Sequence, residues 1–237
     1  MQGYHQQPQF AQRTSSRAEL HGGVQQFMTG VYGWMTAGLG VTAAVIYGLS
    51  FSPDTVLLFA LSPLRWVFFL GLLGIGWFAP SRIPNMDRAV AVGIFLVYSA
   101  LMGAFISWIP LAYNLGSIAS ALGGTVGIFS VMALWGFFTK KDLSGMGQFL
   151  FMALGGAVIG SVINVLFLHS SAMGFAIAAI VAVVSAGLTA YTNQAIKQIY
   201  LMHGGGGNLA INGALALYVD FINLFLSLLR LFGSSRD

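Results

Sequence analysis

Asp220 is the residue whose type and position point most directly to chemistry. It lies midway along an apolar run, ALALYVDFINLFLSLLRLFG, that contains no other acidic residue. Asn223, Ser227 and Arg230 follow it at i+3, i+7 and i+10, so the four polar residues share one face of a helix. A carboxyl group in such a segment is costly in lipid, tends to face the bundle interior, and marks a proton or ion path.

Two interpretations of Asp220 stay open at this point. Burial disfavours the charged form of a carboxyl group, so Asp220 could exchange a proton near neutral pH or sense a cation. Alternatively, it is a structural anchor that is protonated or neutralised by a basic residue. The candidates for such pairing, or for gating, are Lys197, Arg230 and Arg82.

A second polar cluster, LTAYTNQAIKQIY, follows about twenty apolar residues and is the best candidate to face Asp220. Asn193 and Lys197 are one helical turn apart and share a face. We interpret Lys197 as part of a helix end that emerges from the membrane. Thr192 and Asn193 lie deeper, and we expect them to take part in the bundle interior as ion- or pH-sensing residues, together with Asp220 and Asn223.

The composition predicts the elements that must position these residues. Of 237 residues, 57% are hydrophobic and 7% are charged, whereas a soluble domain carries about 25% charged residues. Sixteen charges cannot solvate a globule of this size, so a soluble enzyme is excluded. The chain has no Cys, and no nucleophile–base pair or metal set for catalysis is visible. We therefore expect a membrane protein that is not an enzyme, has no cofactor and does not bind nucleic acid.

Seven runs are long and apolar enough to cross a bilayer as helices, which need about 20 residues each. They are too long and too continuous for barrel strands. The predicted fold is therefore all-α and polytopic, with a polar, mobile N-terminal tail over residues 1–24 and a membrane domain over 25–237. The predicted spans cover residues 27–51, 66–86, 89–110, 117–138, 147–168, 172–196 and 209–232.

Basic residues between the spans predict the orientation. Seven Lys or Arg residues fall in the tail and the even-numbered loops, against Arg65 alone in the odd-numbered loops. By the positive-inside bias, the N-terminus is cytoplasmic. Seven complete spans would place the C-terminus outside, whereas a re-entrant last segment would return it to the cytoplasm. The seven residues are Arg13, Arg17, Arg82, Arg88, Lys140, Lys141 and Lys197.

Glycines at four-residue spacing predict where helices approach closely. Gly123 and Gly127 form one such pair, and Gly156 and Gly160 form another. Small residues at this spacing let the backbones of membrane helices approach. We therefore expect close helix crossings at both motifs.

Several segments together resemble one family. ALALYVDFINLFLSLLRLFG is similar to the C-terminal signature of the Bax inhibitor-1 family, and GVYGWMTAGLGVTA is similar to the first span of its bacterial branch. LVYSALMG, FTKKDLSGMGQFLFMAL and GLTAYTNQAIK match in order and spacing. The resemblance implies a seven-helix bundle in the inner membrane, acting as a pH-sensitive calcium leak channel. It also implies an alternative: a non-conducting regulator that binds a membrane protease or another membrane partner.

Such family members carry two aspartates, one ending the sixth span and one in the seventh, which share a proton and can hold a cation. Asp220 matches the seventh-span aspartate, and the resemblance makes it the candidate calcium ligand. The usual sixth-span pattern is Tyr-Asp-x-x-x-Ile-Lys, but here Thr192 follows Tyr191 in the aspartate position. A hydroxyl can ligate through oxygen, but it brings no charge and does not titrate. We therefore expect weaker cation binding and a pH response that depends on Asp220 alone or with a basic partner.

Overall fold

The computed structural model describes residues 7–234, with side chains described from residue 22 onward. These residues form nine α-helices, which confirms the predicted all-α fold. A 3₁₀ turn at Ile83–Asn85 follows the third helix, and a π-helical turn at Asn164–Leu168 follows the seventh. The α-helices are α1 (Gln7–Ser50), α2 (Pro53–Leu61), α3 (Leu64–Arg82), α4 (Arg88–Phe105), α5 (Ile109–Ala112), α6 (Leu115–Phe138), α7 (Ser144–Ile163), α8 (Ser171–His203) and α9 (Leu209–Phe232).

Seven segments of the described chain are long and apolar enough to cross a membrane, in agreement with the predicted number. Among the seven spanning segments, the largest difference in length is at α8, which continues to His203 beyond the predicted boundary at 196. The apolar pattern ends near Lys197, but the helix ends only at Gly204, where a φ of 72° stops it. The short helix α2, which lies between the first two spans, was not predicted, and neither was α5, which forms the end of the third spanning segment.

The predicted tail overlaps the first helix. Residues 1–6 of that tail lie outside the described residues, while α1 begins at Gln7 and continues without interruption to Ser50. The segment before the first span contains several good helix formers, including Gln, Ala, Arg and Leu, and polar composition does not oppose a helix. The mobility of the tail stays a prediction.

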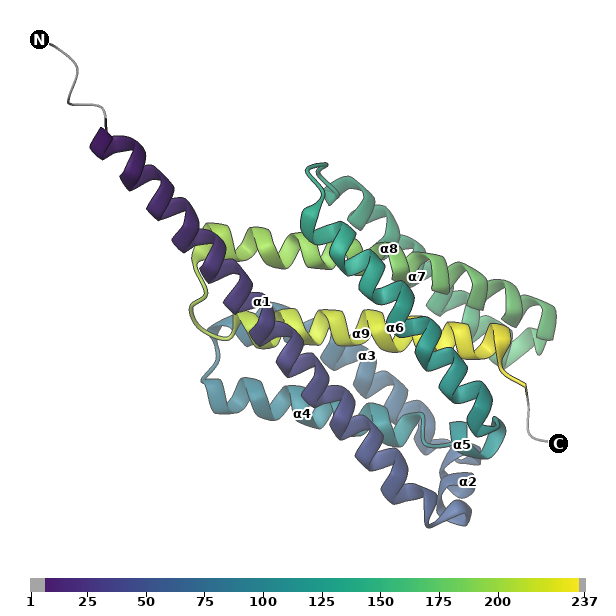
Figure 1. Ribbon diagram of the computed structural model, residues 1–237. Coiled ribbons are helices and arrows are strands. Elements are labelled where there is room, and N and C mark those ends of the chain that lie inside the picture. The colour runs from purple at the N-terminus through teal and green to yellow at the C-terminus, as the bar shows by residue number, and fades with distance from the viewer. Residues whose placement is uncertain (1–6, 235–237) are drawn as a thin grey trace, which may run out of the picture.

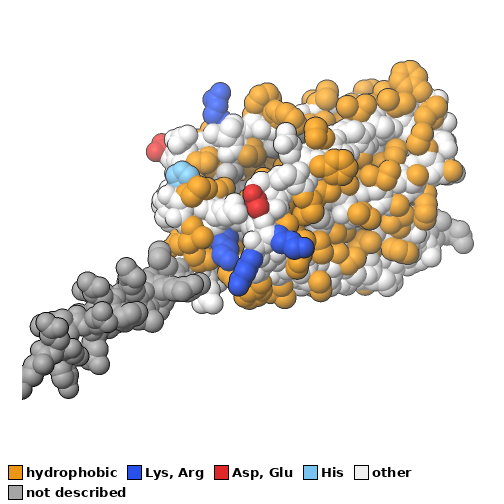
Figure 2. Space-filling view, turned by 90° about the horizontal axis from the view of Figure 1, so that it is seen from above, with side chains coloured by type: hydrophobic (Ala, Val, Ile, Leu, Met, Phe, Trp, Pro, Cys, Tyr) orange, Lys and Arg blue, Asp and Glu red, His pale blue; other side chains and the backbone are white. Residues whose placement is uncertain are grey.

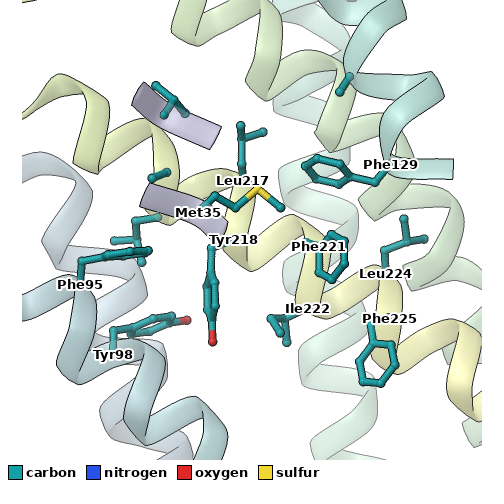
Figure 3. Close-up of a cluster of buried hydrophobic side chains, with 14 of the residues drawn as sticks. Met35, Phe95, Tyr98, Phe129, Leu217, Tyr218, Phe221, Ile222, Leu224 and Phe225 are labelled. Carbon is teal, nitrogen blue, oxygen red and sulfur yellow. The ribbon is translucent and has the colours of Figure 1, made fainter. Parts of the chain in front are cut away.

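Helix α9 lies at the centre of the bundle (Figure 1) and packs against α1, α4, α6 and α8. Its large side chains build the core. Figure 3 shows Tyr218 facing Phe95 and Tyr98 from α4, and Phe221 facing Phe129 from α6. The contact between α8 and α9 is the most extensive helix pair. Side chains on the face of α9 that contacts α8 therefore lie in the bundle interior.

The two ends of α9 lie at opposite ends of the bundle, which supports a complete span over a re-entrant segment. At its start, Asn208 donates from Nδ2 to the carbonyl of Met86 at 2.6 Å, beside the connection from α3 to α4. At its end, the backbone N–H of Ser234 donates to Ser117 Oγ at 2.9 Å, at the start of α6. Figure 1 shows α9 running from one end of the bundle to the other.

The surface separates into an apolar side and a charged end. Trp77 is 80% exposed and Phe167 is 76% exposed, which water would disfavour and lipid tolerates. Figure 2 shows hydrophobic side chains over most of the visible face, with Lys, Arg, Asp and His side chains gathered near one end. This is the distribution expected of a protein whose flanks contact a bilayer.

The close helix crossings do not occur at the predicted glycine motifs, and that prediction was wrong. No heavy atom of another element lies within 4 Å of the position that a Cβ would take at Gly123, Gly127 or Gly156, and Gly160 has only an ordinary contact with Ile177. The tightest crossing is instead at Gly136 of α6, where a Cβ would overlap the backbone of Ala190 in α8. Four-residue spacing identifies a small-residue face but does not say which face the neighbouring helix uses.

Replacing Gly136 by Ala is therefore expected to destabilise the bundle by about 1–3 kcal/mol, the usual cost of overpacking a close contact. The added methyl group meets backbone atoms of Ala190, which cannot rotate away as a side chain could. Thermal unfolding in detergent measures the effect. Gly123→Ala is the matched control on the same helix, and an equal loss of Tm in both variants would contradict the assigned crossing.

Candidate functional site

Asp220 and Thr192 meet in the centre of the bundle, at the interface between α8 and α9. The hydroxyl of Thr192 donates to Asp220 Oδ2 at 2.8 Å. Asp220 is 6% exposed and Thr192 is 7% exposed, so water has little access to the pair. Asp220 is the twelfth of 24 residues in α9, which places it about 17 Å from either end of the helix at 1.5 Å per residue. The structure thus brings together the two positions that the sequence singled out.

Asn193 is fully buried but faces a different partner. Its Oδ1 accepts a short hydrogen bond from the hydroxyl of Tyr32 in α1, and its Nδ2 donates to the carbonyl of Thr189 at 2.8 Å. Neighbouring residues on a helix point about 100° apart, so Thr192 can face α9 while Asn193 faces α1. Asn193 therefore links α8 to α1 one residue away from the carboxyl group. Tyr32 is a contributor to this region that we did not predict.

The basic candidates do not reach Asp220. Lys197 donates from Nζ to the carbonyl of Phe137 at 2.9 Å and lies 4.7 Å from the centre of its ring. Arg230 is ten residues beyond Asp220, about 15 Å along α9, and its guanidinium lies next to Gly174 at the start of α8. Arg82 is exposed at the end of α3. Within the described side chains, Asp220 has a hydroxyl partner and no ion pair.

A row of small polar residues continues from Thr192 along α8. Ser185, Thr189 and Thr192 are spaced at i, i+4 and i+7 and are all buried, so they share a face. Thr189 Oγ1 donates to the carbonyl of Ser185 at 2.9 Å, and Ser185 Oγ is buried without a hydrogen-bond partner among the described atoms. On α9, Asn223 is half-buried and Ser227 is buried. The serine and threonine spacing in VVSAGLTAYT is the signal that could have revealed this row.

A second buried polar cluster joins α1, α4 and α9. The hydroxyl groups of Thr42 and Tyr218 are 2.6 Å apart, and Thr42 Oγ1 also lies 2.9 Å from the carbonyl oxygen of Ser99. Tyr218 is two residues before Asp220, and Figure 3 shows its ring between α4 and α9 beside Tyr98. Tyr218 is fully buried. Its hydroxyl is satisfied inside the protein, which removes the need for an interfacial position.

The donor set at Asp220 limits what the site can hold. Among the described residues, no three His, Asp or Glu side chains are close enough to share a metal ion. Calcium takes 6–8 oxygen ligands, and the pair offers one carboxylate and one hydroxyl. Other ligands would have to be water or backbone carbonyls, which fits weak, transient cation contact. The same pair can also take up and release a single proton.

Gln194 fixes the neighbouring end of α8 to the connection between α6 and α7. Its Oε1 accepts from the backbone N–H of Leu143 at 2.8 Å, and its Nε2 donates to the carbonyl of Lys141 at 2.7 Å. Gln194 is buried, and of its two bonds the one from Leu143 is buried while the one to Lys141 is partly buried. One side chain thereby holds the loop at residues 139–143 against α8.

Replacing Gln194 by Leu is expected to destabilise the protein by about 1–3 kcal/mol, because the buried N–H of Leu143 would lose its acceptor. Gln198→Leu, one turn later and exposed, is the matched control and should stay within about 0.5 kcal/mol. Thermal unfolding in detergent compares the two variants. Equal Tm values would show that the two bonds contribute nothing net.

Comparison with known proteins places the chain among membrane proteins. The family described as "Inhibitor of apoptosis-promoting Bax1" matches residues 24–237. An inner membrane protein, YbhL of Escherichia coli strain K12, is 40% identical over 233 residues, which cover 94% of this chain and 98% of that protein. An uncharacterized protein of Deinococcus radiodurans is 38% identical over 217 residues, covering 90% and 92% of the two chains. An uncharacterized membrane protein of Streptococcus pyogenes serotype M1 is 36% identical over 215 residues, covering 89% and 93%.

Proposed function

Since this chain belongs to the Bax inhibitor-1 family of integral membrane proteins, we propose that it is a pH-sensitive cation leak gated at Asp220. Calcium is the ion to test first, because a hard cation prefers oxygen ligands. The relative named an inner membrane protein and the seven apolar helices support a multi-pass position in the inner membrane. The end that carries most of the basic loops would face the cytoplasm, and with it the N-terminus. The proposal assigns no catalytic activity.

One observation carries the proposal: Asp220 is buried at mid-bundle with a neutral hydroxyl as its partner. An ionised structural anchor would be expected to hold a basic partner, since an unpaired buried charge is strongly unfavourable. None of the described Lys, Arg or His side chains forms an ion pair with Asp220. The carboxyl group is therefore free to respond to a proton or a cation.

The arrangement also predicts the direction of the pH response. A protonated Asp220 is neutral and suits the dry, closed packing of α8 against α9. An ionised Asp220 needs more than one hydroxyl to compensate its charge, so ionisation favours a conformation in which water or a cation reaches the site. Cation flux should therefore rise as pH rises through the titration of Asp220 and fall as the group is protonated.

Calcium flux into proteoliposomes that contain the purified full chain, measured over a range of pH, tests the proposal. A flux above that of empty liposomes, increasing with pH, is the expected result. Flux equal to the protein-free background at every pH would reject the leak.

A second function, a non-conducting regulator that binds a membrane protease or another membrane partner, is favoured by a separate observation. Helix α1 begins at Gln7 and projects beyond the bundle (Figure 1), whereas its membrane-spanning part begins at Gly22. A projecting helix is available to a partner. Co-purification of a protease that is lost when residues 1–24 are deleted would support this function, and a preparation free of partners would count against it.

A further inference from the structure

A pocket at the charged end of the bundle lies apart from Asp220. It has a volume of about 170 Å³ and lies between the end of α6, the loop that follows it and the last turns of α8. This is below the ~300 Å³ at which pockets for whole small molecules begin, so it suits one compact group. The pocket is lined by Phe137, Thr139, Lys140, Lys141, Asp142, Gln194, Lys197, Gln198 and Leu201.

The charge of the pocket is positive. Three lysines and one aspartate line it, which leaves a formal charge of +2 (3 − 1). Asp142 is engaged locally, because its Oδ1 accepts from the hydroxyl and the backbone N–H of Ser144 at 2.6 and 2.9 Å. These two bonds, the side-chain one first, lower the pKa of Asp142, so its charge is constant at neutral pH. The excess of positive charge therefore favours an anion.

The walls of the pocket are held in place. Gln194 fastens the backbone at Lys141 and Leu143 to α8, as described above. Lys197 is fixed by its bond to the carbonyl of Phe137 and by the ring beneath it. An ammonium group has three donors, so Lys197 keeps two more for a ligand. Lys140 and Lys141 are exposed and can close over a bound group from the loop side.

The surroundings distinguish a lipid headgroup from a free anion. The pocket lies where α6 ends and α7 begins, at the end of two apolar spans. Phe138 beside it is 71% exposed, and Leu201 in its wall is 53% exposed. A dissolved phosphate gains nothing from these apolar side chains, whereas a phospholipid could bring its phosphate to the lysines and its acyl chains to the apolar flank.

We propose that this pocket binds the phosphate headgroup of an anionic phospholipid, with Lys140, Lys141 and Lys197 as its cationic contacts. The lipid would join the α6–α7 loop to α8 and hold the charged end of the bundle at the membrane surface. Basic pockets between membrane helices are suited to such headgroups. The proposal does not depend on whether the protein conducts ions.

The test measures binding of phosphatidylglycerol and of phosphatidylcholine to the purified full chain in detergent, by native mass spectrometry over a lipid titration. Phosphatidylglycerol should bind at least fivefold more tightly. The double variant Lys140→Gln/Lys141→Gln should weaken its binding roughly 10- to 30-fold, since each lysine near an anionic headgroup is worth about a factor of five. Both lysines are exposed, so the double variant should keep the Tm of the natural chain.

The matched control is Arg82→Gln/Arg88→Gln, which removes two exposed positive charges from outside the pocket. It should leave phosphatidylglycerol binding within twofold of the natural chain. An equal loss of phosphatidylglycerol affinity in both double variants would show that general surface charge, and not this pocket, binds the lipid. Equal affinity for the two lipids would overturn the preference for an anion. Displacement of phosphatidylglycerol by glycerol phosphate at a similar concentration would assign the site to a free phosphate instead.

Discussion

Replacing Asp220 by Asn is expected to lower calcium flux roughly 10- to 100-fold and to remove its dependence on pH. Asparagine has nearly the same size and can still accept the hydrogen bond from Thr192, so the packing of α8 against α9 should persist. The variant cannot ionise and therefore cannot favour the hydrated conformation. An interaction with an ionised carboxylate is worth about 1.5–3 kcal/mol, and its loss corresponds to the decrease in calcium flux of roughly 10- to 100-fold. A calcium-sensitive dye in proteoliposomes measures the flux over an experimental range of pH 5.5 to 8.5.

Asp54→Asn is the matched control for this substitution. Asp54 is an exposed carboxyl group at the start of α2, and its removal changes the net charge of the protein by the same amount. Its flux and pH profile should match those of the natural chain. If the Asp220 variant kept both the flux and the pH profile, Asp220 would be a structural anchor. A similar change in both variants would indicate an effect of net charge and not of the site.

Replacing Thr192 by Asp is expected to strengthen calcium binding about tenfold or more, equivalent to ~1.4 kcal/mol or more. The substitution puts a second carboxylate opposite Asp220, where the hydroxyl now lies at 2.8 Å. Two close carboxylates cannot both ionise at low cost, so their titrations should be coupled and one proton retained until a cation replaces it. Isothermal titration with calcium at two pH values measures both the affinity and the number of protons released.

The neutral variant Thr192→Asn has nearly the size of aspartate and should leave calcium affinity within about twofold. Combining Thr192→Asp with Asp220→Asn should abolish the gain, because the pair and not one carboxylate holds the ion. The natural chain, the two single variants Thr192→Asp and Asp220→Asn, and their combination form a double-mutant cycle. Unchanged affinity in Thr192→Asp would show that the missing carboxylate does not limit binding. A gain that persists without Asp220 would place the calcium elsewhere.

Much of the architecture follows from local hydrophobicity. A run of about 20 apolar residues can satisfy its backbone in lipid only as a helix, so the number of spans and most of their boundaries agree with the structure. The boundary at α8 differs, because apolar content does not end a helix. Gly204 ends it by adopting a positive φ. The short helix α2 was missed because nine residues between two spans carry too weak a pattern.

The site could be predicted only in part. Asp220 and Thr192 stood out because a carboxyl group in an apolar run is rare and because the family pattern marks the position facing it. The sequence cannot show that Asn193 faces α1, that Lys197 bonds to α6, or that Ser185 Oγ is buried without a hydrogen-bond partner among the described residues. Each of these facts depends on the rotation of α8 about its axis, which the length and hydrophobicity of an apolar run do not specify.

Helix type, number of spans and the deep position of one carboxyl group are local properties, because they depend on the free energy of single segments in lipid. The lack of a basic partner for that carboxyl group among the described residues, the crossing at Gly136 and the basic pocket at the end of α8 depend on how neighbouring helices fit together. Interhelical contact in lipid is governed by close packing and hydrogen bonds and not by hydrophobicity. A hydropathy pattern contains little information on that fit, which explains why Asp220 and Thr192 were found from the sequence, whereas the contact with Tyr32, the crossing at Gly136 and the basic pocket came only from the fold.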